Sequence, residues 1–314
     1  MCTFCNDKNA SDPTLTHPPF EKLTDSIQND PQNANLFYKR GLLLHENDFS
    51  DLAKKDLQHA MSITPKEEYA LSLGRLLVEQ HPDSAIVFLE SMQTKIPGSN
   101  QLSIALARGY QVKKNYERAI EICDGILQKD GNDLDALILK SELLEMTGKE
   151  AESLSYLERG HYIAPADVEL VHKLAFIYAD TKNKKALALS DSLIASDMNN
   201  IHAEPHLFKG IYFQRMQNYP LALKHFNDAI AKDYKFLDAH MYKGETLYDQ
   251  KKFGEAKKAF ALALTITPTY AEAYYWIGKC EEVQNHKPEA KDAYLKAYGL
   301  DKNLVEAKEA ADKL

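Results

Sequence analysis

The chain has 314 residues, and its 38 lysines and arginines against 46 aspartates and glutamates give a formal net charge of −8. Hydrophobic residues make up 44% and charged residues 27%, a balance typical of folded globular proteins that excludes a largely disordered chain. No apolar run approaches the roughly 20 residues that a membrane-spanning helix needs, and the negative charge argues against nucleic acid as a partner.

Residues 1–19 differ from the rest of the chain because they are polar, contain prolines and lack periodicity, so we expect a flexible leader. Cys2 and Cys5 form half of a zinc or redox motif, whereas a closed zinc site needs four ligands. Cys5 is also followed by a short polar and acidic linker, as at the mature start of a bacterial lipoprotein. The chain as given predicts a cytoplasmic protein. If the true start lies upstream, lipidation at Cys5 would anchor it to the cell envelope, facing the periplasm, and the alternative function is then assistance in outer-membrane assembly, secretion or pilus formation.

A helix-hairpin pattern begins after an expected capping helix at residues 20–33. Small residues stand where two helices would touch, a larger apolar residue fills the gap, and a proline ends the unit. The first unit shows this pattern at Gly41, Ala53, Leu57, Ala60 and Pro65. A later unit shows it at Gly244, Ala256, Phe260, Ala263 and Pro268. One such hairpin exposes more apolar surface than it can bury alone, so it needs neighbours of the same kind.

The pattern recurs at steps of 34 or 35 residues, which predicts about eight tandem units. The expected units are residues 34–65, 66–97, 100–131, 134–165, 168–198, 203–234, 237–268 and 271–302. Residues 303–314 form an expected C-terminal capping helix with a polar outer face. Strand signals are absent, and the sequence therefore predicts an all-α chain.

These residues resemble the tetratricopeptide repeat family over nearly the whole chain. The middle units depart from the family pattern, because Gly131 and Met198 replace the closing proline and Ser153 replaces an alanine. The resemblance implies a right-handed α-solenoid whose first helices line a concave groove. It also implies a non-catalytic scaffold that binds a protein or peptide segment.

Repeat phase predicts which first-helix residues face that groove. The apolar candidates are Phe176, Leu207, Ile211, Met241, Tyr248 and Tyr275, and the acidic candidates are Glu142, Glu145, Asp180, Glu245, Asp249 and Glu282. Packing against the second helices is the alternative for the apolar set. The acids predict a negative groove, which would attract basic or polar segments and repel strongly acidic ones. Family members that hold acidic chaperone tails use a basic clamp, whereas this chain has Tyr38 and Leu42 at early groove positions.

The remaining candidates for chemistry are weak. No phosphate-binding loop, nucleophile elbow or H-E-x-x-H motif is present, so we expect no enzyme activity and no cofactor. His202 and His206 have i,i+4 spacing, but the phase places His202 in a turn, and we expect no metal there. Cys123 and Cys280 fit packing positions. A metal or redox protein that uses Cys2 and Cys5 is the alternative of another class.

Overall fold

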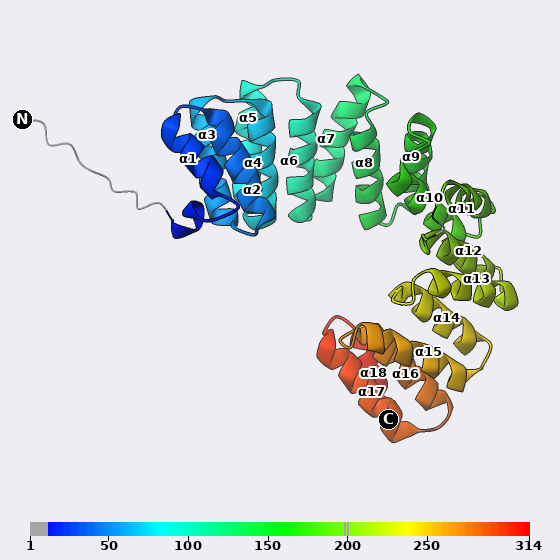
Figure 1. The fold of residues 1–314 in the computed structure, drawn as a ribbon. Helices are drawn as coiled ribbons and strands as arrows, with labels where there is room; N and C mark the ends of the chain where they lie inside the picture. Colours follow the sequence, from blue (N-terminus) through cyan, green and yellow to red (C-terminus); the bar gives the residue numbers. More distant parts are fainter. Residues whose placement is uncertain (1–11, 198, 200) are drawn as a thin grey trace, which may run out of the picture. The chain divides into compact units, whose positions relative to one another are not determined.

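The computed structural model describes residues 12–197, 199 and 201–314. These residues form one short 3-10 helix and eighteen α-helices without any strand, which confirms the all-α prediction (Figure 1). The helices are η1 (Pro13–Thr16), α1 (Glu21–Asn29), α2 (Ala34–Glu46), α3 (Ser50–Ile63), α4 (Glu67–Gln80), α5 (Pro82–Lys95), α6 (Asn100–Val112), α7 (Tyr116–Lys129), α8 (Leu134–Met146), α9 (Glu150–Ile163), α10 (Val168–Asp180), α11 (Lys185–Ser196), α12 (Glu204–Arg215), α13 (Tyr219–Lys232), α14 (Leu237–Asp249), α15 (Phe253–Ile266), α16 (Ala271–Val283), α17 (Lys287–Leu300) and α18 (Val305–Lys313).

The helices divide between two compact units. The N-terminal unit ends at Ala164 and contains η1 to α9, and the C-terminal unit runs from Pro165 to Leu314 and contains α10 to α18. Within each unit the helices pack as consecutive hairpins, from α2–α3 to α8–α9 and from α10–α11 to α16–α17. First helices of neighbouring hairpins also touch, as α4 touches α6 and α12 touches α14. The first helices therefore form one layer of each unit and the second helices form another. The right hand of the expected superhelix stays a prediction.

Most hairpin turns use one residue with a left-handed backbone. Seven turns have this feature, at Asp48, Lys114, Gly148, Lys182, Gln217, Lys251 and Asn285. In the first turn the amides of Asp48 and Phe49 donate to the carbonyls of His45 and Leu44, at 3.1 and 2.9 Å. This is the Schellman arrangement, which satisfies the last carbonyls of a helix. The α4–α5 turn differs because Pro82 opens α5 directly after His81.

Three hairpins of the C-terminal unit pack a glycine of the first helix against a ring of the second. A Cβ added to Gly210, Gly244 or Gly278 would lie 2.3, 2.4 or 2.6 Å from the nearest atom of Phe226, Phe260 or Tyr294, respectively. These distances are far below van der Waals contact, so only glycine fits while the rings keep their places. The rings are themselves fully buried. This close approach holds each helix pair together.

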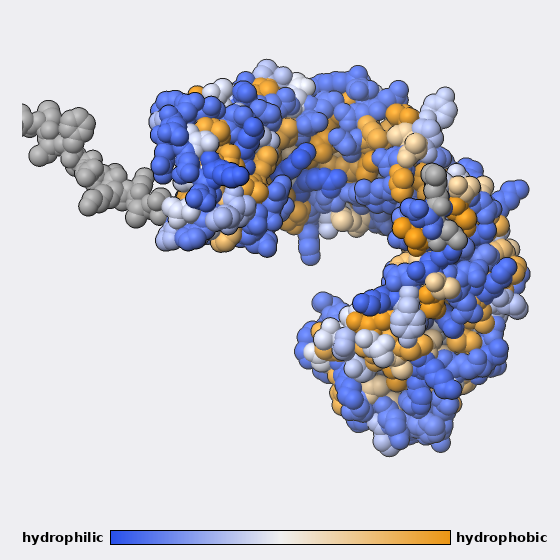
Figure 2. All heavy atoms as spheres, in the orientation of Figure 1, coloured by the Kyte–Doolittle hydropathy of each residue, from blue (hydrophilic) through white to orange (hydrophobic). Residues whose placement is uncertain are grey.

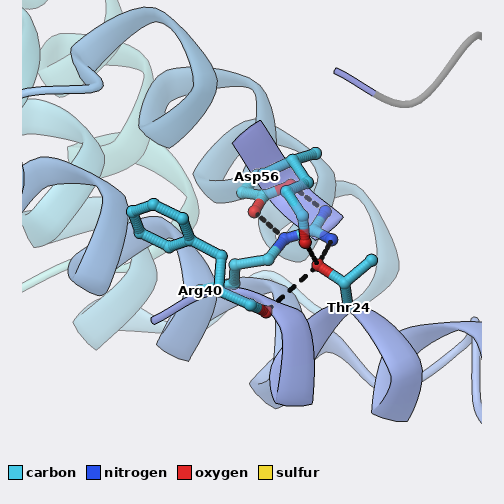
Figure 3. Close-up of polar contacts among 5 residues, drawn as sticks. Thr24, Arg40 and Asp56 are labelled. Atoms are coloured by element: carbon cyan, nitrogen blue, oxygen red, sulfur yellow. Dashed lines mark hydrogen bonds and ion pairs between the residues drawn. The ribbon is translucent and has the colours of Figure 1, made fainter. Parts of the chain in front are cut away.

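A buried ion pair joins the first three helices of the N-terminal unit (Figure 3). Arg40 on α2 donates from Nε and Nη2 to the two carboxylate oxygens of Asp56 on α3, at 2.6 and 2.9 Å. Its Nη1 also donates to Oγ1 of Thr24 on α1, at 3.0 Å. Both charged side chains are at least nine-tenths buried. The fork of donors satisfies the guanidinium and fixes the capping helix α1 on the first hairpin.

Residues 12–19 correct the prediction of a flexible leader. Asp12 caps η1 by accepting a hydrogen bond from the amide of Thr14 at 3.0 Å. Leu15 packs against the hydrophobic core, and its carbonyl accepts a hydrogen bond from Thr24 Oγ1 at 2.7 Å. The leader prediction is therefore wrong for these residues. Cys2 and Cys5 lie outside the described residues.

Figure 2 shows hydrophobic residues interspersed with hydrophilic ones along both units. None of the helices in the described part of the chain combines the length and the apolar content that a membrane span requires.

Candidate functional site

The residues predicted to line a groove are divided between the two units. Glu142 and Glu145 lie on α8 of the N-terminal unit, whereas the other ten lie on α10, α12, α14 and α16 of the C-terminal unit. All of them lie on first helices. The C-terminal unit therefore holds most of the candidate site.

A cavity of about 350 Å³ opens on the layer of first helices in the C-terminal unit. Its lining combines acidic and aromatic side chains with two aliphatic ones, and we call it the acidic–aromatic cavity. The lining residues are Phe176, Glu204, Leu207, Phe208, Phe236, Asp238, Met241, Tyr242, Glu245, Tyr270 and Glu272. Phe236 and Tyr270 are the residues just before α14 and α16, so their rings enter from the helix starts. The cavity thus collects side chains from four successive hairpins.

Two carboxyl groups of this cavity, those of Asp238 and Glu245, hold their protons more tightly than usual. Burial, with the neighbouring charges of Glu272 and Asp249, raises the pKa of Glu245 to about 7, although Arg215 and a hydrogen bond from Gln214 act in the opposite direction. Burial and the Glu272 charge also raise the pKa of Asp238. Both raised pKa values mean that the surroundings disfavour the ionised carboxylates relative to the protonated forms.

Within the described part of the chain, neither Asp238 nor Glu245 forms an ion pair. The nearby guanidinium of Arg215 instead binds Asp180, with Nη2 at 2.7 Å from the carboxylate. Asp180, predicted as an acidic groove residue, is therefore paired with an arginine of its own chain. The cavity keeps its acids without a cation to balance them, which makes it suited to a positive group from outside.

Three predicted apolar anchors are buried rather than open to solvent. Ile211 is 0% exposed, and Leu207 and Met241 are each 4% exposed. Their helices are covered on several sides, because α12 contacts α10, α11, α13 and α14. The prediction that Ile211 is an exposed anchor is wrong, and Leu207 and Met241 form the cavity floor. Phe176 remains available, since it is 40% exposed on the cavity wall.

Tyr248 and Tyr275 belong to a second cluster that the chain fills with its own lysine. Lys279 Nζ lies 3.9 Å from the ring centre of Trp276 and 5.2 and 5.6 Å from those of Tyr248 and Tyr275. Glu282 is also engaged at this cluster, because Tyr294 donates a hydrogen bond to its carboxylate at 2.6 Å. Asp249 is exposed near the end of α14. Lys279 therefore already occupies the aromatic faces of Tyr248 and Tyr275 as the cation of this cluster.

The N-terminal unit has a cavity of a different character. Its space of about 390 Å³ is lined by Arg75, Val78, Glu79, Gln101, Ile104, Ala105, Arg108 and Asp135. Two arginines face two acids, so its charges are balanced. Arg108 also pairs with Glu142 at 3.3 Å, while Glu145 is exposed on α8. Of these two cavities, only the acidic–aromatic cavity of the C-terminal unit therefore has acids in its lining without lysines or arginines.

Repeat phase missed several aromatic residues that line the acidic–aromatic cavity. Phe208 and Tyr242 lie 34 residues apart, as do Phe236 and Tyr270. Trp276 continues the first series one unit further on. The recurrence of an aromatic residue at one repeat position was the signal that marks this surface.

The remaining cysteine and histidine predictions can be placed on the structure. Cys123 and Cys280 are fully buried, and burial raises the pKa of each thiol to about 12, which suits packing rather than reactivity. His202 precedes α12, as expected, and its ring is exposed to solvent. His206 lies within α12 beside the next helix of its hairpin.

Hairpins that repeat with a turn at steps of 34 or 35 residues and a small residue at the helix contact define a helical repeat protein. A tetratricopeptide repeat model matches residues 209–271, and a model described as "Psidin, N-terminal TPR repeats region" matches residues 112–220. The chain is a tetratricopeptide repeat protein.

Solved structures share this fold at low sequence identity. A tetratricopeptide repeat protein from Parabacteroides merdae aligns with a TM-score of 0.61 at 15% identity, over 90% of this chain and 98% of that one. Cut9–Hcn1, described as an APC/C hetero-tetramer, aligns with a TM-score of 0.56 at 13% identity, over 92% of this chain and 57% of the matched chain.

Sequence relatives include subunit 2 of the ER membrane protein complex. The Xenopus tropicalis protein is 21% identical over 217 residues, which cover 59% of this chain and 72% of the relative. Subunit 2-B from Xenopus laevis is 24% identical over 165 residues, which cover 51% of this chain and 53% of the relative.

Proposed function

We propose that the chain is a non-catalytic scaffold whose C-terminal unit binds a basic segment of a partner protein in the acidic–aromatic cavity. The observation that carries this proposal is that half-buried Glu245 and the more exposed Asp238 line one open cavity and form no ion pair with another described residue. Partial burial of a carboxylate without a partner is unfavourable, so binding of an external cation is more favourable at Glu245 than at a fully exposed acid. Membership of a repeat family that is usually non-catalytic supports a binding function.

The lining favours a lysine or arginine side chain as the occupant. The lining includes the rings of Phe208, Tyr242 and Tyr270, and a cation that rests on the face of an aromatic ring gains about 0.5–2 kcal/mol. The volume of about 350 Å³ lies at the low end of the range for ligand pockets, about 300–1,000 Å³. One long side chain with its neighbours fits this space better than a large cofactor. Acidic peptides would meet like charges.

Binding of a cation should release a proton from Glu245. Its pKa of about 7 means that roughly half of these carboxyl groups are protonated at pH 7. A positive side chain nearby lowers that pKa, so binding releases up to about half a proton at neutral pH. The apparent binding enthalpy in calorimetry should therefore depend on the ionisation enthalpy of the buffer.

The test is selection from a random peptide display library on the immobilised full-length chain. We expect enrichment of peptides with lysine or arginine beside apolar residues, and loss of that enrichment in the Asp238→Asn, Glu245→Gln double variant. The matched control is Glu255→Gln, Glu289→Gln, which removes the same charge from exposed sites on α15 and α17. Enrichment of acidic peptides, or equal loss in the control, would contradict the proposal.

A second candidate function is that of a structural subunit in a larger assembly. The printed names of the matched relatives and of Cut9–Hcn1 each describe a component of a complex, which favours this role here. The native mass of the complex in extracts of the source cells tests it, because a monomer of 35.5 kDa would argue against a stable assembly.

Lipidation at Cys5 stays a separate prediction, which mass spectrometry of the native N-terminus tests.

A further inference from the structure

Two histidines and an aspartate come together across the α12–α13 hairpin, apart from the acidic–aromatic cavity. His206 lies on α12, and His225 and Asp228 lie on α13. One ligand atom from each side chain can be chosen so that all three lie within 4.8 Å of one another. In the part of the chain that the structure describes, this is the cluster with the residue types and spacing of a metal site.

The distances within this cluster are too long for hydrogen bonds. His225 Nδ1 lies 3.7 Å from the Asp228 carboxylate, beyond the usual 2.7–3.2 Å of a hydrogen bond. Ligand atoms around a tetrahedral zinc ion, with bonds of about 2.0–2.1 Å, lie about 3.3 Å apart. Side-chain rotations that bring the ligand atoms closer together by up to about 1.5 Å would therefore complete the geometry around an ion.

Both imidazoles also carry an unused nitrogen. The Nδ1 atoms of His206 and His225 are buried, and neither has a hydrogen-bond partner. Buried polar atoms normally find a partner, so these two nitrogens, on rings whose centres lie 6.5 Å apart, require an explanation. A bound cation would satisfy them.

The surroundings keep the rings neutral and in place. Burial lowers the pKa of both histidines, which leaves a lone pair on each ring at neutral pH. The charges of Lys232 and Lys209 also lower the pKa of His206, and Lys209 Nζ lies 2.5 Å from the carboxylate of Asp191. Phe213 stacks on His225 with ring centres 5.5 Å apart and planes within 6°, so the imidazole is held against a firm surface.

We propose that His206, His225 and Asp228 bind a divalent transition-metal ion of the zinc type. Two imidazole nitrogens and one carboxylate oxygen are the donor set of many zinc sites, and three protein ligands leave one position for water or a partner's side chain. The ion would clamp α12 to α13. Because α12 also carries Glu204, Leu207 and Phe208, the clamp would stiffen one wall of the acidic–aromatic cavity.

The test is calorimetric titration of zinc chloride into the full-length, tag-free chain in a Cys2→Ser, Cys5→Ser background. We expect one equivalent of zinc to bind. His206→Ala and Asp228→Asn should each weaken binding by more than the roughly 10–100-fold that loss of an outer-shell partner causes. His202→Ala is the matched control, since His202 is exposed one turn away, and its affinity should be unchanged.

A second readout separates metal binding from damage to the fold. Zinc at about 100 times its dissociation constant should raise the thermal midpoint by about 5 °C or more, and this shift should vanish in His206→Ala. Circular dichroism without zinc should show the same helix content in every variant. No heat of binding, equal affinity in His206→Ala, or loss of binding in His202→Ala would each overturn the proposal.

Discussion

Replacing Gly244 and Gly254 by alanine should change stability in opposite directions. The Cβ of alanine at position 244 would lie 2.4, 2.7 and 2.8 Å from three ring atoms of Phe260. The ring must therefore move by about 1 Å, since carbon atoms pack at about 3.5–4.0 Å. Phe260 is fully buried and stacks on Trp276 with ring centres 5.7 Å apart, so it cannot move alone.

The magnitude follows from two opposing effects. Overpacking of a buried site costs about 1–3 kcal/mol, whereas alanine gains up to about 1 kcal/mol over glycine in a helix. Gly244→Ala should therefore destabilise the C-terminal unit by about 1–2 kcal/mol. Gly254 lies on the exposed first turn of α15, and no heavy atom lies within 4 Å of an added Cβ. Gly254→Ala should therefore stabilise the chain by up to about 1 kcal/mol, because the helix propensity improves without overpacking.

The assay is urea unfolding followed by tryptophan fluorescence. Trp276 is the single tryptophan of the chain and touches the Phe260 ring, so its signal reports on this hairpin. Phe260→Leu should also reduce the cost of Gly244→Ala, because the colliding ring atoms are gone. Equal midpoint shifts for both alanine variants, or the same cost of Gly244→Ala beside leucine, would refute this account of the helix contact.

Three further substitutions test other parts of the structure. Asp56→Ala should destabilise the N-terminal unit by about 3–5 kcal/mol in thermal unfolding, because it leaves the Arg40 charge buried and unpaired. Glu245→Gln should stabilise the chain increasingly as pH rises from about 4.5 to 7. The pKa of Glu245 is raised in the folded state, so the folded chain binds more protons there than the unfolded chain, and native stability falls over that interval. Lys251→Gly should stabilise by about 0.5–1 kcal/mol in urea, because Lys251 has a φ of 61° that costs a residue with a Cβ about 1–2 kcal/mol.

Each of these predictions has a clear contrary result. Wild-type stability in Asp56→Ala would mean that the Arg40 pair contributes nothing. Parallel pH curves for Glu245→Gln and the native chain would mean that this carboxyl titrates normally. A less stable Lys251→Gly chain would mean that loss of the lysine side chain, with the greater backbone freedom of glycine in the unfolded state, costs more than relief of the strained φ gains.

The helical hairpins were predictable from sequence because their contacts are local. Gly244 meets Phe260 within one unit, and the same pair of positions recurs every 34 residues, so the period itself specifies the packing. The ordered segment around Leu15 was not predictable in this way. Its contacts depend on Thr24 in a different helix, and nothing in its own composition records them.

The candidate site was only partly predictable. Repeat phase placed Phe176 and Glu245 on one surface, and both line the same cavity, but it did not separate the floor of that cavity from its wall. Burial at Ile211 depends on how closely four helices surround α12, which spacing along the chain does not report. The i,i+4 spacing of His202 and His206 likewise directed attention along one helix, whereas His206 meets His225 across the hairpin.

The two buried thiols offer a way to follow motion in each half of the molecule. Cys123 lies on α7 of the N-terminal unit and Cys280 lies on α16 of the C-terminal unit. A thiol-specific reagent reaches either one only when its hairpin opens, and solenoid hairpins can open separately because each contacts only its neighbours. In a chain without Cys2 and Cys5, the labelling rates at the two positions would therefore give the opening free energy of each half under native conditions. The two thiols thus report separately on the local stability of the N-terminal and the C-terminal unit.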